Sequence, residues 1–162
     1  MGMHELSAVL WRERELLETL HFKLDIEHLL LTTGRHRWLG RAAQEIEYVT
    51  ARLKEVGLAR AVEAAEVAEG LGLDAMCTLR ELVAECDDDV WRDLLESHLD
   101  ALVRVTGAIA GVRDGNERML REASRAAQDA AGGPGFVVVG GTYDARGLAR
   151  DLPSARLVDE RI

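Results

Sequence analysis

The chain has 162 residues, which is enough for one domain with its own hydrophobic core. Hydrophobic residues make up 48% of it but aromatic residues only 4%, and this Leu- and Ala-rich mix favours helix-on-helix packing over a β-sandwich. The net charge of −9 argues against nucleic acid as the main partner, because phosphate binding needs a basic surface.

The first long segment, from His4 to Thr32, is predicted to be a helix. One face repeats at every third or fourth position, which is helical rather than strand spacing. Its members are Leu6, Leu10, Glu13, Leu17, Leu20, Leu24, Glu27 and Leu31. A helix about 40 Å long cannot bury such a face alone, so another helix or a partner must cover it.

A second helix is predicted from Leu39 to about Ala68, where the same spacing resumes. Gly34 can take the left-handed conformation that ends the first helix. Because the connection is short, the two helices should form a long antiparallel hairpin.

An acidic connector follows the hairpin. Residues 60–100 hold twelve Asp and Glu against three Arg, which gives −9 for this window. The excess fits either a solvated acidic surface or a basic or neutral partner. Thr78 and Glu81 form a capping-box pattern that predicts a short helix from Leu79 to Glu85. The triple Asp at 87–89 predicts a cap for the next helix, since it lacks the order of a calcium-binding loop.

A third long helix is predicted from Val90 to Ala131. Asn116 falls on its apolar face, where a polar residue can fix the register of packed helices. His98 falls on the same face and is interpreted as a half-buried edge histidine rather than a metal ligand. We therefore expect an all-α, coiled-coil-like helical domain over residues 1–131. Residues 132–162 are Gly-rich and are expected to form a flexible tail, or one that orders only against a partner.

The sequence lacks the residue patterns that are typical of common catalytic and cofactor sites. No pair of Glu-x-x-His motifs suits a diiron bundle, no Gly-Lys-Ser/Thr ending suits a phosphate loop, and no Gly-x-Ser-x-Gly elbow is present. We expect no enzyme activity, no metal and no cofactor. A basic, apolar signal segment is also lacking at the N-terminus, so we expect a cytoplasmic protein with reduced thiols and no membrane insertion.

Several phrases, in this order, resemble the flagellar export chaperones of the FlgN type, most closely the versions from high-GC Gram-positive bacteria. They are Leu10-Trp11-Arg12-Glu13-Arg14-Glu15-Leu16-Leu17-Glu18, Phe22-Lys23-Leu24, Gly34-Arg35-His36-Arg37-Trp38-Leu39, Trp91-Arg92 and Thr142-Tyr143-Asp144-Ala145-Arg146-Gly147. The resemblance implies a helical, non-enzymatic, cytoplasmic chaperone. Such a chaperone binds hook-associated (hook–filament junction) proteins before export and delivers them to the flagellar type III export gate.

This resemblance suggests two binding sites. An amphipathic client helix would be read by a row on the third helix, and the alternative is that this row is the core seam. The row consists of Leu102, Val105, Ile109, Val112, Asn116 and Leu120. A tyrosine in the C-terminal segment is associated with gate docking in this family, which assigns that role to Tyr143; the alternative is an aromatic that packs on the bundle.

A second class of function stays open at this point. The same apolar faces could let the chain self-associate as a structural coiled-coil protein, a homo-oligomer rather than a chaperone. A chaperone should form a small complex of fixed stoichiometry with its client. A structural protein should form large homo-oligomers that grow with concentration.

Overall fold

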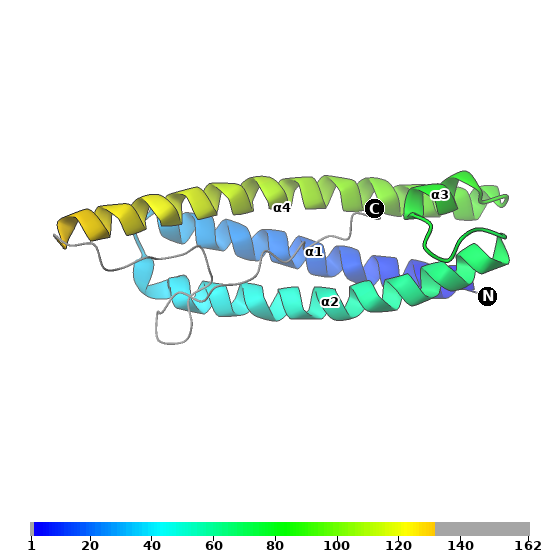
Figure 1. Cartoon of the computed structure of the whole chain (residues 1–162), viewed down its shortest axis with the longest axis horizontal. Coiled ribbons are helices and arrows are strands. Elements are labelled where there is room, and N and C mark those ends of the chain that lie inside the picture. Colours follow the sequence, from blue (N-terminus) through cyan, green and yellow to red (C-terminus); the bar gives the residue numbers. More distant parts are fainter. Residues whose placement is uncertain (1, 132–162) are drawn as a thin grey trace. The chain divides into compact units, whose positions relative to one another are not determined.

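The computed structural model describes residues 2–131, and every regular element in this range is helical. The elements are α1 (Gly2–Thr32), η1 (His36–Trp38), α2 (Leu39–Gly70), α3 (Leu79–Ala84) and α4 (Asp89–Ala130) (Figure 1). The prediction of an all-α protein with three long helices packed together is confirmed. The predicted tail, residues 132–162, lies outside the described residues. None of the described helices combines the length and apolar character needed to cross a membrane.

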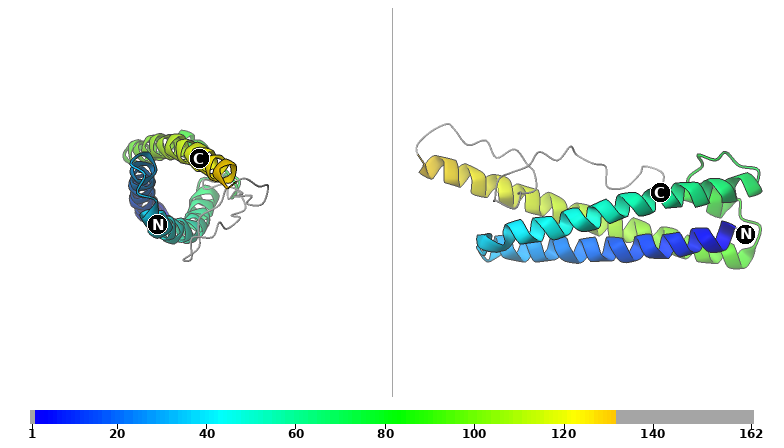
Figure 2. Two further views of the ribbon diagram at one scale, coloured as in Figure 1. Left: turned by 90° about the vertical axis from the view of Figure 1, so that its left-hand side faces the viewer. Right: turned by 90° about the horizontal axis from the view of Figure 1, so that it is seen from below.

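The described residues fall into two compact units, to which α1, α2 and α4 each contribute. Unit 1 holds residues 2–19 and Thr50–Gly107, and therefore also contains α3. Unit 2 holds Leu20–Val49 and residues 108–131. Within each unit the long helices pack around an apolar core (Figure 2).

The turn between α1 and α2 lies in unit 2 and is set by Gly34. This residue has φ 67°, a left-handed conformation that favours glycine because it has no Cβ. The Arg35 N–H donates to the Leu30 carbonyl at 2.9 Å, and the Gly34 N–H donates to the Leu31 carbonyl at 3.3 Å. These two bonds form a Schellman motif, which satisfies carbonyls at the end of α1. After this turn α2 runs back beside α1 in unit 2 (Figure 1), which confirms the predicted antiparallel hairpin.

The core is built mainly from leucine. All eight positions of the face predicted on α1 are buried, including the two glutamates. In unit 1 the other buried apolar residues come from the other three helices and include Leu53, Val56, Leu79, Leu82, Leu95 and Leu102. In unit 2 they include Ala42, Ala43, Ile46, Val49 and Ile109. Burial of this apolar area is the main favourable contribution to folding.

Glu13, in unit 1, is the first of the two buried glutamates. Its Oε2 lies 3.3 Å from Nε of Arg60 on α2, and both side chains are about nine-tenths buried. Burial raises the pKa of Glu13, while the charge of Arg60 acts in the opposite direction. This pair links α1 to α2, and Arg60 had no assigned role in the sequence prediction.

Glu27, in unit 2, is the second buried glutamate, and it meets Asn116 of α4. The Asn116 amide nitrogen donates to Glu27 Oε2 at 2.9 Å and to the Leu24 carbonyl at 3.0 Å. His28 Nδ1 donates to the Asn116 carbonyl oxygen at 2.9 Å. Burial raises the pKa of Glu27, which the hydrogen bond from Asn116 opposes and the nearby charge of Glu117 reinforces.

The contacts of Asn116 make one pairing of α4 with α1 better than any shifted one. A shift of α4 along α1 would leave the Asn116 amide and the Glu27 carboxylate buried without partners. The sequence prediction that Asn116 fixes register thus acquires named partners, because its three hydrogen bonds all go to one turn of α1.

Replacement of Asn116 by Ala should lower the free energy of unfolding by about 1–3 kcal/mol, because Glu27 keeps its burial but loses its donor. Gln44→Ala removes an exposed amide in the same unit and serves as the control. Urea unfolding followed by circular dichroism measures both variants. Equal stability of N116A and Q44A would show that the buried contacts do not hold α4 in place.

Candidate functional site

The row predicted to bind a client lies on α4, and the structure divides it into buried and partly exposed members. Leu102 is 0%, Ile109 3% and Asn116 1% exposed, so these three belong to the core. Val105, Val112 and Leu120 have intermediate exposure. The surface open to a partner is therefore narrower than the row read from the sequence.

Beyond the row, the apolar spacing of α4 continues in alanines. Ala123, Ala126, Ala127 and Ala130 follow Leu120 at three- and four-residue steps, and all four are exposed. Alanine buries little apolar area, so this segment gains little from packing within the chain. It is the longest stretch of the α4 seam that the rest of unit 2 leaves uncovered.

His98 occupies the centre of a polar cluster in unit 1. The sequence prediction of a half-buried edge position was wrong, because its exposed fraction is 0%. Its Nδ1 lies 3.4 Å from Nη1 of Arg14, and its Nε2 lies 3.3 Å from the Ser7 hydroxyl. Arginine can only donate, so Nδ1 accepts and the proton of the neutral ring sits on Nε2, facing Ser7. The Trp11 ring packs edge-on at 5.2 Å between centroids.

This cluster explains the protonation state of His98. Burial lowers its pKa, and the positive charge of Arg14 lowers it further. The guanidinium of Arg14 also stacks 4.4 Å over the Trp11 ring. Both ring nitrogens of His98 thus have partners within unit 1. This arrangement is typical of a structural histidine rather than of one that binds a metal ion. The only sequence signal for this cluster was the presence of polar residues at positions where the helix spacing predicts apolar ones.

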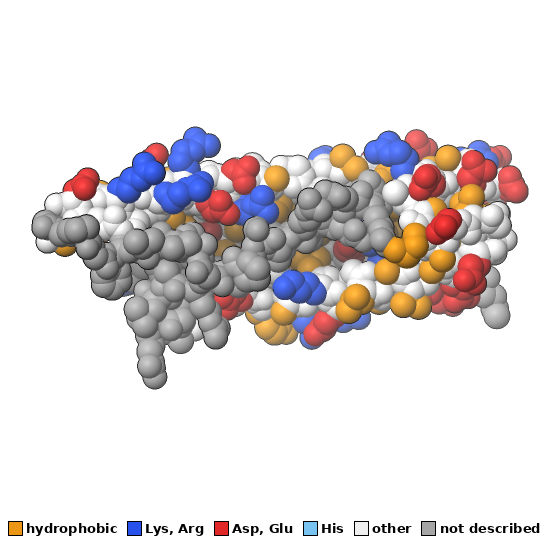
Figure 3. All heavy atoms as spheres, viewed as in Figure 1, with side chains coloured by type: hydrophobic (Ala, Val, Ile, Leu, Met, Phe, Trp, Pro, Cys, Tyr) orange, Lys and Arg blue, Asp and Glu red, His pale blue; other side chains and the backbone are white. Residues whose placement is uncertain are grey.

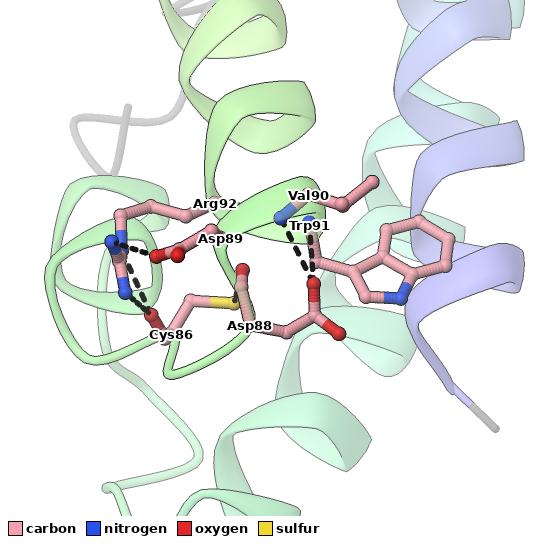
Figure 4. A network of polar contacts seen from close by, with 6 residues as sticks. All are labelled: Cys86, Asp88, Asp89, Val90, Trp91 and Arg92. Atoms are coloured by element: carbon pink, nitrogen blue, oxygen red, sulfur yellow. Dashed lines mark hydrogen bonds and ion pairs between the residues drawn. The ribbon is translucent and has the colours of Figure 1, made fainter.

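Two acidic residues of unit 1, Glu81 and Asp88, cap helices. Asp88 accepts hydrogen bonds from the N–H groups of Val90 and Trp91 at 2.9 and 3.1 Å, which caps α4 as predicted (Figure 4). The Thr78–Glu81 capping box of α3 is also confirmed. Hydrogen bonds from the Thr78 N–H and hydroxyl lower the pKa of Glu81.

Arg92 stabilises the connection between α3 and α4 through hydrogen bonds. Its guanidinium donates to the Cys86 carbonyl at 2.9 and 2.7 Å and to Asp89 at 2.7 Å (Figure 4). Figure 3 shows acidic side chains gathered over α3 and the beginning of α4. Among these carboxylates, Glu81 and Asp88 cap helices and Asp89 pairs with Arg92, so local structure accounts for these three.

Among residues 2–131, no group of three or more His, Cys, Asp and Glu side chains is arranged to hold a metal ion. Tyr143, the predicted gate-docking residue, lies outside the described residues.

The lowered pKa of His98 predicts a pH dependence of stability. Below about pH 6.5 the unfolded chain takes up a proton that the folded chain resists, so His98 costs stability as pH falls toward its lowered pKa. The raised pKa values of Glu13 and Glu27 act with the opposite sign, because the folded chain holds these protons more tightly than the unfolded chain does. Thermal unfolding of wild type and His98→Gln between pH 7.5 and 5.5 isolates the histidine.

Wild type should lose more stability than H98Q over this range, while exposed His36→Gln should follow wild type. Parallel pH profiles for wild type and H98Q would contradict the assignment of a buried, neutral His98.

The comparisons with known proteins agree with the resemblance found in the sequence. The family model described as FlgN protein matches residues 1–148, a range that includes all described helices and Tyr143. No curated protein and no solved structure matches the chain. Because the family match covers most of its length, the chain belongs to the FlgN family of non-enzymatic cytoplasmic chaperones, which bind hook-associated proteins during flagellar export.

Proposed function

We propose that this FlgN chaperone holds its hook-associated client by an amphipathic helix docked on the last part of α4, from Leu120 onward. The observation that carries the proposal is the run of exposed alanines that continues the apolar spacing of α4 after Leu120. A client helix would present apolar residues at positions i, i+3, i+4 and i+7 to this strip.

The geometry of unit 2 supports this location. Asn116 lies beside Leu24, Glu27 and His28, and α1 ends only four residues after His28, at Thr32. In this unit α1 and α4 run in the same direction (Figure 1), so Leu120 lies near the level at which α1 ends. From Leu120 to Ala130, α4 continues for about 15 Å. This length has no α1 residues beside it.

The chemistry of the strip suits a helix rather than an extended peptide. Small side chains let a second helix approach closely, so larger apolar residues of the client can supply the buried area. Charged residues of both signs border the strip, including Arg118, Arg121, Glu122 and Arg125. These side chains can select among amphipathic helices through the charges at their edges.

The buried members of the original row take a different part in this proposal. Leu102, Ile109 and Asn116 can touch a client only if the helices that cover them move away. We infer that they hold α4 in place, and that Val105 and Val112 border the core. Self-association through the seams, the alternative from the sequence, is disfavoured because the leucines of α1 are already covered within the chain.

Leu120→Asp should weaken client binding at least tenfold and leave helicity unchanged, because it puts a charge into the docking strip. Ile109→Asp should instead lower the thermal midpoint sharply, since it buries an unpaired charge in the core. Val103→Asp, at an exposed position of the same helix, is the matched control for both. Calorimetric titration with the hook-associated proteins of the same organism and circular dichroism provide the two measurements.

The site would have to be moved elsewhere if L120D bound its client as V103D does. A folded I109D variant that had lost client binding would instead favour the whole row as the client surface.

We also propose that Tyr143 docks the chaperone at the export gate. The proposal is supported by the family match, which extends to residue 148. Tyr143→Ala should reduce binding to the purified cytoplasmic part of the gate and leave client affinity unchanged. Tyr48→Ala, which removes an exposed tyrosine from α2, is the control. Undiminished gate binding of Y143A would rule out this role.

A further inference from the structure

We infer that the tip of the α1–α2 hairpin, residues 29–41, makes peripheral contact with an anionic lipid surface. The tip belongs to unit 2 and comprises the end of α1, the Gly34 turn, η1 and the first residues of α2. Such contact is a second interaction, separate from client binding and gate docking.

The tip carries an excess of positive charge. Between Glu27 and Glu45 the chain has no acidic residue, although it has 29 of them in total. The same interval holds Arg35, Arg37 and Arg41, together with two histidines. Glu45 accepts a hydrogen bond from Arg41 at 2.9 Å, so that arginine is partly neutralised. The positive charge of the tip therefore rests mainly on Arg35 and Arg37, which flank His36.

The central part of the tip is exposed to solvent. Every residue from Thr32 to Trp38 is exposed, and η1 has no buried residue. The Schellman motif at Gly34 fixes this conformation through backbone hydrogen bonds, without help from side chains in the core. These seven exposed residues lie at the end of the hairpin. Their side chains face outward and do not line a groove for a helix.

The tip also exposes large apolar side chains. Trp38 is 49% exposed and Leu29 is 56% exposed. The Arg37 guanidinium lies 5.2 Å from the centroid of the Trp38 ring, so cation and indole are held together. Tryptophan prefers the headgroup level of a bilayer, where its apolar ring and its N–H are both accommodated.

Together these features fit a lipid surface better than the other anionic partners. Arginine recognises phosphate through its planar fork of donors, and basic residues near a membrane surface are attracted by anionic headgroups. Nucleic acid is disfavoured by the net charge of −9. An acidic helix would need an apolar groove, whereas the tip exposes one indole and two arginines on an outward turn. With so few cations the contact should be weak, reversible and sensitive to salt.

The test is flotation of the full-length chain with vesicles. One set contains equal amounts of phosphatidylglycerol and phosphatidylcholine, and the other contains phosphatidylcholine alone, each at 50 and 500 mM NaCl. The chain should bind only the phosphatidylglycerol vesicles and should be largely released at high salt. Arg35→Glu/Arg37→Glu should reduce the partition coefficient at least tenfold, and Trp38→Ala should reduce it severalfold.

Arg12→Glu/Arg104→Glu provides the same change in net charge at two exposed positions of unit 1, and it should bind the vesicles more than the tip variant does. Circular dichroism and client titration of the tip variant should match wild type. Absence of binding to phosphatidylglycerol vesicles would overturn the inference. So would equal losses in the two double variants, because binding would then follow net charge and not the tip.

Discussion

The leucine face of α1 must be buried by other helices, and the packing of the described helices follows from this requirement. A single helix cannot bury such a face, and α1 carries it from Leu6 to Leu31. In each unit, residues of α2 and α4 are buried together with this face, so all three long helices contribute to the core. Apolar contacts of this kind are similar at many registers, which makes them strong but poorly specific.

Polar contacts within the seam supply the missing specificity. In unit 1, Glu13 pairs with Arg60, and His98 contacts Arg14. In unit 2, Asn116 binds one turn of α1. Each of these groups is costly to bury alone, so each favours the pairing that supplies its partner. The register so chosen determines where α1 ends beside α4 in unit 2, and with it the length of α4 on which we propose the client site.

The proposed client site follows from the different exposure of residues along α4. Residues that a client could have used, such as Leu102 and Ile109, are needed to hold α4. A binding surface must then come from segments that the seam does not use. In unit 2 we propose the alanine strip after Leu120 for the client and the hairpin tip around Trp38 for a lipid surface. The two differ in chemistry, since the exposed strip is made of alanines and the tip carries exposed arginines.

Local patterns in the sequence were enough to predict the three long helices, the cap and turn residues at their ends, and the family resemblance. Apolar spacing, capping residues and Gly34 each act over only a few residues at a time. The sequence also placed Asn116 in the seam. Only the tertiary structure decided which members of the α4 row are core and which are open, and which residues partner Glu13, Asn116 and His98. Periodicity identifies a face of a helix but not its neighbour, since packing joins residues that are distant in sequence.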